Sequence, residues 1–223
     1  MSERKIAFSE GEFYHVYNRG NSKQVIFHTD EDHNRFIRLM YYANSNVAFK
    51  IEYLKRSDFS VDRGNELVAI GAYCLMPNHF HVLCTPLVEG GLSKFMQKLT
   101  TGYSMYFNNK YERTGTLFEG KFKARWVDSD QYMKYLYAYI HLNPVKLIDP
   151  TWKEEGIKDS KNAFDFALAY KYSSLKDYFE QVLPVRPAAE ILNKPAFPNY
   201  FISSGYIERE LFDWLDFDLP KQL

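Results

Sequence analysis

The feature that most constrains the fold is a pair of apolar runs separated by a two-residue turn. The runs ELVAIGAYCLM (66–76) and HFHVLCTP (79–86) are rich in apolar and aromatic side chains, and Pro77 and Asn78 stand between them. Such runs are typical of strands. Proline and asparagine favour turns, and proline is excluded from the centre of a sheet. The pattern therefore predicts two neighbouring strands joined as a β-hairpin.

Periodicity predicts the remaining elements. Further strands are expected at residues 12–21, 48–54 and 116–127, where β-branched and aromatic side chains alternate with polar ones. Apolar residues at helical spacing predict a first helix capped by Thr29 or Asp30. By the same criterion we expect helices over 94–111, with Ser93 as N-cap, and over about 130–143, 163–179 and 206–215.

Length and composition are compatible with one main domain and an appendage. The chain has 223 residues, 46% of them hydrophobic and 25% charged, as is ordinary for a folded protein. We expect a domain over residues 1–150 and a helical extension over 151–223 packed on it. No apolar run is long enough to cross a bilayer, and the N-terminus is too polar for a signal peptide. A cytoplasmic protein without membrane contact is expected, with Cys74 and Cys84 as buried thiols.

Charge is balanced overall but unevenly distributed. The 28 basic and 28 acidic side chains give a net charge of zero, which is unusual for a nucleic-acid-binding protein. Residues 91–126 nevertheless contain seven basic and two acidic side chains, a net charge of +5. This stretch is compatible with a DNA-binding face, although a solvated helix face explains it equally well. The candidate DNA-binding residues are Lys94, Lys98, Lys121, Lys123 and Arg125.

The strand over 79–86 carries a candidate metal site. Residues two apart on a strand share a face, so His79 and His81 are expected to point together while Phe80 packs on the other side. Two imidazoles so placed can bind a divalent metal. They can equally form a polar patch, and a third ligand is needed to decide between the two interpretations.

The helix over 130–143 offers that third ligand and a nucleophile. Residues four apart on a helix share a face, so Tyr139, Asn143 and Tyr135 are expected in one row. An amide oxygen can bind a hard metal, and a phenol beside a metal is a candidate nucleophile. Tyr137 and His141 are expected on other faces. His15, on the first strand, either lines the site or is a buried, hydrogen-bonded histidine.

Three segments in order resemble the single-tyrosine HUH transposases, especially the REP-associated tyrosine transposases. They are LMPNHFHVLCTP, TLFEGKFKARWV and YAYIHLNPVK, and YHVYNRGN near the start adds to the resemblance. The resemblance implies the α+β class: an RRM-like or ferredoxin-like antiparallel sheet with helices packed on one face, here with a C-terminal helical extension. It covers most of the chain, to about residue 174.

The same resemblance implies an activity and a role for each site residue. His79, His81 and Asn143 match the ligands of a divalent metal, Mg²⁺ or Mn²⁺, and Tyr139 matches the nucleophile that forms a 5′-phosphotyrosine link to DNA. Single-stranded, hairpin-forming DNA is the implied partner. A monomer is favoured over a homodimer with exchanged tyrosines.

Two other functional classes remain open. One is a non-catalytic single-stranded nucleic-acid-binding module, because an RRM-like sheet with exposed aromatics binds without metal. The other is a metal-dependent hydrolase that uses water in place of a tyrosine.

Overall fold

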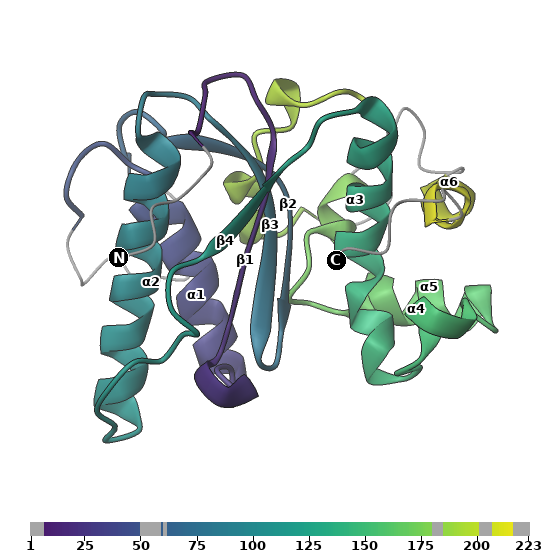
Figure 1. Cartoon of the computed structure of the whole chain (residues 1–223), viewed down its shortest axis with the longest axis horizontal. Helices are drawn as coiled ribbons and strands as arrows, with labels where there is room; N and C mark the ends of the chain where they lie inside the picture. Colours follow the sequence, from purple (N-terminus) through teal and green to yellow (C-terminus); the bar gives the residue numbers. More distant parts are fainter. Residues whose placement is uncertain (1–6, 50–58, 60–61, 180–184, 201–206, 216–223) are drawn as a thin grey trace.

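A four-stranded antiparallel sheet lies at the centre of the computed structural model (Figure 1). The structure describes residues 7–49, 59, 62–179, 185–200 and 207–215. Its strands are β1 (Tyr14–Arg19), β2 (Val68–Met76), β3 (His79–Pro86) and β4 (Lys123–Trp126). Its α-helices are α1 (Asp30–Ala43), α2 (Gly91–Lys110), α3 (Asp130–Leu142), α4 (Trp152–Glu155), α5 (Ser160–Ala169) and α6 (Ile207–Leu215). Short 3-10 turns are η1 (Asn21–Lys23), η3 (Asn143–Leu147), η4 (Leu175–Phe179), η5 (Pro187–Ile191) and η6 (Lys194–Ala196).

The strand order is β2-β3-β1-β4, so β3 and β1 are the central strands. β2 and β3 form the expected hairpin, with Met76 opposite His79 across the turn. β1 runs antiparallel to both of its neighbours, and its His15 lies opposite Leu83 of β3 and Arg125 of β4. The hairpin predicted from residues 66–86 is therefore confirmed, and β1 lies next to it.

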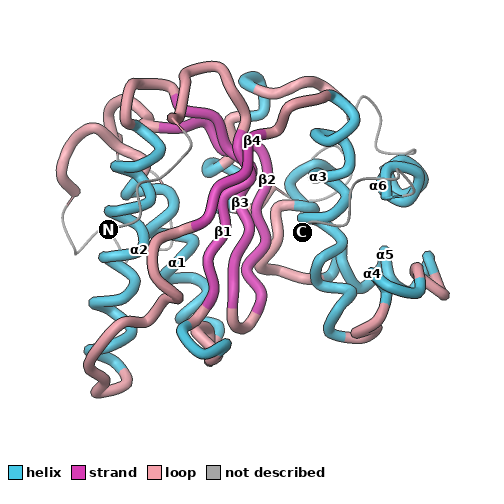
Figure 2. The backbone as a smooth tube through the Cα atoms, viewed as in Figure 1, coloured by secondary structure: helices cyan, strands magenta, loops and turns pink. Residues whose placement is uncertain are grey.

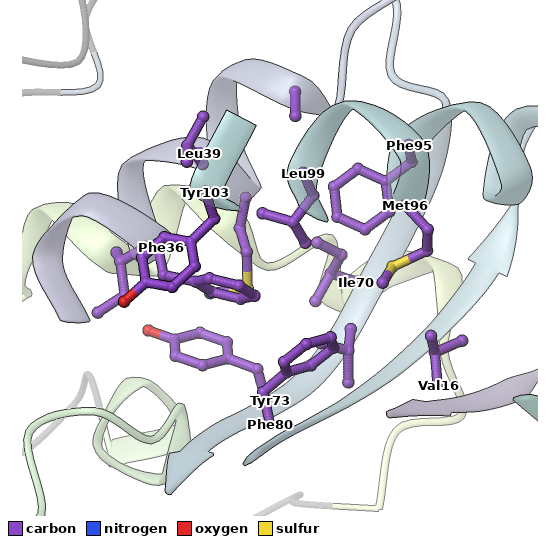
Figure 3. Packing of buried hydrophobic residues seen from close by; sticks show 14 of the residues in the cluster. Val16, Phe36, Leu39, Ile70, Tyr73, Phe80, Phe95, Met96, Leu99 and Tyr103 are labelled. Atoms are coloured by element: carbon purple, nitrogen blue, oxygen red, sulfur yellow. The ribbon is translucent and has the colours of Figure 1, made fainter. Parts of the chain in front are cut away.

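Helices cover both faces of the sheet (Figure 2). On one face α1 and α2 form a first core with the sheet, in which the ring of Phe36 lies 5.0 Å from those of Phe80 and Tyr103 (Figure 3). On the other face α3, α5 and α6 form a second core with residues such as Ala72 and Leu83. The α+β class and the antiparallel sheet are confirmed. The second layer of helices goes beyond the single-faced arrangement that the resemblance implied.

The helices begin where local chemistry favours it, with one exception. Thr29 caps α1 through a capping box with Asp32, as expected. The expected cap at Ser93 is wrong: α2 begins at Gly91 and is preceded by Gly90, whose φ of +67° suits glycine.

Cys74 and Cys84 are buried free thiols, as expected. Among the described helices, none combines the length and the apolar character needed to span a membrane.

Two expected elements are shorter than predicted. The strand expected over 116–127 is reduced to β4, because Gly120 with a φ of +70° turns the chain just before it. The helix expected over 163–179 ends at Ala169. Residues 172–174 instead bond to the free edge of β2, where Leu75 donates to Tyr172. The strand expected over 48–54 falls mostly on residues outside those described.

Asp32 joins α1 to α2 through a buried carboxylate. It accepts hydrogen bonds from Lys110, Tyr106 and Tyr111. Burial alone would raise its pKa, but these bonds lower the pKa of Asp32 from 3.8 to about 2. The carboxylate therefore stabilises the fold above pH 3.8, and this contribution is lost as the pH falls toward about 2.

Replacing Asp32 with Ala leaves Lys110 and two phenols without their buried acceptor. We expect the free energy of unfolding to fall by about 3 kcal/mol in urea denaturation at neutral pH. Glu31→Ala is the control, because Glu31 also pairs with Lys110 but is largely exposed. It should cost less than about 1 kcal/mol. Equal, small losses for the two variants would contradict the assignment.

Candidate active site

The candidate site lies on the sheet face that α3 covers. Alternation along β3 directs His79 and His81 to this face, while Phe80 packs in the first core. β1 lies beside β3 with Tyr17 opposite His81, so His15 projects from the same face. The sheet thus brings together three imidazoles, two of them from β3 and one from β1.

His79 is held in one tautomer by the hairpin turn. Its Nδ1 lies 2.6 Å from Oδ1 of Asn78. Because an amide oxygen only accepts, Nδ1 carries the proton and Nε2 presents its lone pair. The ring of His79 lies 5.0 Å from that of His81, at an interplanar angle of 85°. The tautomer of His79 is therefore the one that a metal ligand bound through Nε2 requires.

His81 is bonded to His15 within the buried part of the site. Nε2 of His15 and Nδ1 of His81 are 2.8 Å apart, so one of these nitrogens donates and the other accepts. When His81 donates, its Nε2 is left to bind a cation, which is the usual arrangement of a metal-binding histidine and its outer partner. The sequence allowed His15 either to line the site or to be a buried, hydrogen-bonded histidine. In the structure it does both.

The three imidazoles are neutral at physiological pH. Burial lowers the pKa of His15 to about 3 and that of His79 to about 4, and it takes the pKa of His81 well below its ordinary value. The positive charge of Lys153 lowers each pKa further. Because neutral imidazole is the form that binds metals, protons compete weakly with a cation here.

α3 brings Tyr139 to these imidazoles within the same chain. The ring of Tyr139 lies 5.3 Å from that of His81 and 6.1 Å from that of His15, and both pairs meet edge to face. Tyr135, one turn earlier, stacks on Tyr139 with centroids 6.0 Å apart and planes 7° apart. The expectation that Tyr135 shares the face of Tyr139 is confirmed.

Tyr137 and His141 belong to the core on the other side of α3. The ring of Tyr137 packs against Tyr178 and Tyr200, with centroids 6.0 and 5.8 Å away. His141 is buried, and its Nε2 lies 2.8 Å from Oγ of Ser174. Their expected position away from Tyr139 is confirmed, and His141 has a structural role rather than a solvent-facing one.

Asn143 supplies an amide oxygen at the end of α3. Pro144 follows it, and the chain passes there from α3 into the η3 turn. The residue is buried, yet its Oδ1 has no hydrogen-bond partner among the described residues. Burial raises the pKa of Tyr139 and lowers that of His79, and the nearby amide of Asn143 opposes both shifts in part.

These donors fit a divalent metal. A buried acceptor without a partner is costly in an apolar setting, and a cation would satisfy it. Two neutral imidazoles and one amide oxygen form a mixed nitrogen and oxygen donor set that can bind a divalent cation. The described residues hold no group of three or more His, Cys, Asp or Glu side chains suited to a metal. Asparagine is not one of these residue types. The absence of such a group therefore does not argue against a site formed by His79, His81 and Asn143.

Lys153 is a site residue that sequence reasoning missed. Its Nζ lies 2.8 Å from the hydroxyl oxygen of Tyr139 and 4.0 Å from the centre of the ring. Burial raises the pKa of Tyr139, so the phenol is protonated at neutral pH. No motif marks Lys153, because it follows the irregular η3 turn and helical spacing cannot relate it to Tyr139.

The candidate DNA-binding residues divide between the two faces. Lys123 and Arg125 lie two apart on β4, and the guanidinium of Arg125 lies 4.7 Å from the ring centre of Tyr132 on α3. Both therefore project on the face of the site. Lys94 and Lys98 lie on α2, which packs on the opposite face, and Lys98 donates to the carbonyl groups of residues 45 and 47. Lys121 is exposed in the loop before β4.

Part of the chain is similar to a known protein family. Residues 61–143 match the family described as "Transposase IS200 like". This region contains His79, His81, Tyr139 and Asn143, and it covers less than half of the chain. A search of curated protein sequences gave no match.

Solved structures also resemble the chain. One is described as "Structure of the REP associates tyrosine transposase bound to a REP hairpin" and is 14% identical in sequence. The similarity covers 82% of this chain and 89% of that one, with a TM-score of 0.48.

If His15 orients His81 as a metal ligand, its loss should weaken metal binding although His15 is not itself a ligand. We expect His15→Phe to raise the Kd for Mn²⁺ by about 10- to 100-fold, measured by electron paramagnetic resonance of free Mn²⁺. Tyr17→Phe is the control, since the ring of Tyr17 packs at a tilt against the same imidazoles. An unchanged Kd for His15→Phe in a folded protein would rule out the orienting role.

Proposed function

We propose that this chain is a metal-dependent transposase that cleaves and rejoins single-stranded DNA through a 5′-phosphotyrosine at Tyr139. The observation that carries the proposal is the meeting of three groups in one chain. The phenol of Tyr139, the imidazole pair of His79 and His81, and the unsatisfied oxygen of Asn143 converge on one face of the sheet.

His79, His81 and Asn143 would hold the metal, Mg²⁺ or Mn²⁺. When bound, it would supply Lewis-acid stabilisation of the charge that develops on the non-bridging oxygens of a scissile phosphate. The protein's own contribution is orientation. Asn78 and His15 hold the two imidazoles in place, and Tyr135 supports the ring of Tyr139.

The reaction is a transesterification in which Tyr139 is the nucleophile. Its phenolic oxygen forms a bond to phosphorus, and the bond from phosphorus to the 3′ oxygen breaks. The 5′ end then stays on the enzyme, and a free 3′-hydroxyl leaves. Attack by another 3′-hydroxyl reverses the step and rejoins the DNA. Because each step exchanges one phosphoester for another, no external energy source is needed.

We further propose that the substrate is hairpin-forming single-stranded DNA and that one monomer suffices. Lys123 and Arg125 on β4 form a basic edge beside the site, suited to phosphate contacts. Support for action in cis comes from the contact of Tyr139 with imidazoles of its own chain.

A covalent adduct tests the activity. Wild-type protein incubated with single-stranded hairpin DNA and Mn²⁺ should give a protein–DNA band on a denaturing gel. Tyr139→Phe and EDTA should each abolish it, and His81→Ala should reduce it at least about 100-fold. Tyr135→Phe is the matched control and should retain the band, because its ring stacks on Tyr139 but lies one turn away.

Two other outcomes correspond to the rival classes. Cleavage without an adduct, insensitive to Tyr139→Phe, would indicate a metal-dependent hydrolase. Binding without cleavage would indicate a non-catalytic module. An adduct that survives Tyr139→Phe but is lost in Tyr135→Phe would leave the class intact and move the nucleophile by one turn.

The basic edge is tested by salt dependence. Each phosphate contact contributes about −0.7 to the slope of log K against log salt for a single strand. We therefore expect Lys123→Met and Arg125→Met each to make the slope shallower by about 0.7. Lys94→Met, on the opposite face, should leave the slope unchanged. The same loss in all three variants would contradict a DNA path across β4.

A further inference from the structure

Residues that follow the matched region in the sequence contact the candidate site. The match ends at residue 143, and α4 lies beyond it. Lys153 of α4 lies with its Nζ 2.8 Å from the oxygen of Tyr139. We propose that Lys153 is a second catalytic residue, the proton acceptor for the Tyr139 phenol during cleavage and the proton donor to it during rejoining. This inference rests on the proposed function.

The backbone around Lys153 is anchored. Trp152 is buried in the second core, which fixes the start of α4. The amide N–H of Trp152 donates to Asp149, and that of Asp149 donates to Val145 in the η3 turn. A short bonded chain therefore links the end of α3 to α4. The Lys153 side chain itself is exposed along part of its length, and its amine reaches inward to the phenol.

The surroundings of Lys153 lower the pKa of its amine. Partial removal from water and the positive charge of Lys146 lower its pKa to about 8, and Glu154 opposes this weakly. The other groups facing it are the phenol of Tyr139 and three neutral imidazoles, those of His15, His79 and His81. A pKa of about 8 leaves roughly a tenth of the amine unprotonated at pH 7, whereas an ordinary lysine has less than about 0.1%.

With Lys153 as proton acceptor and donor, every proton in cleavage and rejoining is accounted for. In cleavage, the phenolic proton passes to the neutral Nζ of Lys153 as the bond from the oxygen of Tyr139 to phosphorus forms. The departing 3′ oxygen takes a proton from water. In rejoining, a 3′-hydroxyl attacks and loses its proton to water, and the ammonium of Lys153 returns its proton to the departing phenolate. The same residue therefore serves both directions.

A purely electrostatic role for Lys153 makes a different prediction. An ammonium beside the phenol would also stabilise the phenolate, and arginine would then substitute for it. Arginine stays protonated at every accessible pH and cannot accept the proton. Lys153→Arg therefore separates proton transfer from charge, and Lys153→Met removes both.

The test is the single-turnover rate of adduct formation at saturating hairpin DNA and Mn²⁺, followed between pH 6 and pH 9.5. We expect the wild-type rate to rise with pH and to level off above about 8. Lys153→Met and Lys153→Arg should both lose about 100-fold in rate, and the levelling near pH 8 should disappear. Their Kd for the hairpin should stay within about threefold of wild type.

Lys161→Met is the control, because Lys161 is exposed on α5. It should keep the wild-type rate and pH profile, and thermal melting should show all variants folded. Wild-type rate and profile in Lys153→Arg would overturn the proton-transfer role while Tyr139→Phe still abolishes the adduct. Absence of an adduct in the wild-type protein would instead overturn the proposed function, and the role of Lys153 with it.

Discussion

The antiparallel pairing of β1 with β3 is the constraint on which the site depends. The register that places Tyr17 opposite His81 brings His15 within 2.8 Å of the His81 ring. Because side chains alternate along a strand, a slip of one residue would turn these imidazoles into the first core. The apolar residues between them, such as Phe80, oppose that slip. The packing that stabilises the sheet therefore also sets the geometry of the candidate ligands.

A second core fixes the nucleophile against this sheet. α3 packs with α5 and α6 in this core and directs Tyr139 to the strands. Its Tyr137 and His141 pack away from the strands, against Tyr178 and Ser174. The C-terminal residues thus do more than cover the sheet. They hold α3 in place and supply Lys153 beside the phenol. Placement of the tyrosine helix by its own chain is the physical basis for proposing a monomer that acts in cis.

Much of this arrangement could be predicted from local patterns. The turn at residues 77–78 and the two-residue spacing of His79 and His81 sufficed for the hairpin and the shared face, and four-residue spacing linked Tyr135, Tyr139 and Asn143. Long-range effects could not be predicted. The free edge of β2 captures residues 172–174, which ends a helix expected to continue, and Gly120 shortens β4. Lys153 and the bond between His15 and His81 depend on tertiary packing alone.

In the proposed reaction, the Tyr139 side chain is the group that becomes linked to DNA. The most direct test is to digest the protein after reaction with single-stranded hairpin DNA and Mn²⁺, trim the DNA with nuclease, and sequence the modified peptide by mass spectrometry. We expect a nucleotide joined through its 5′-phosphate to Tyr139, within the peptide that contains residues 135–146. A nucleotide on another tyrosine, or a cleaved strand with no modified peptide, would contradict it.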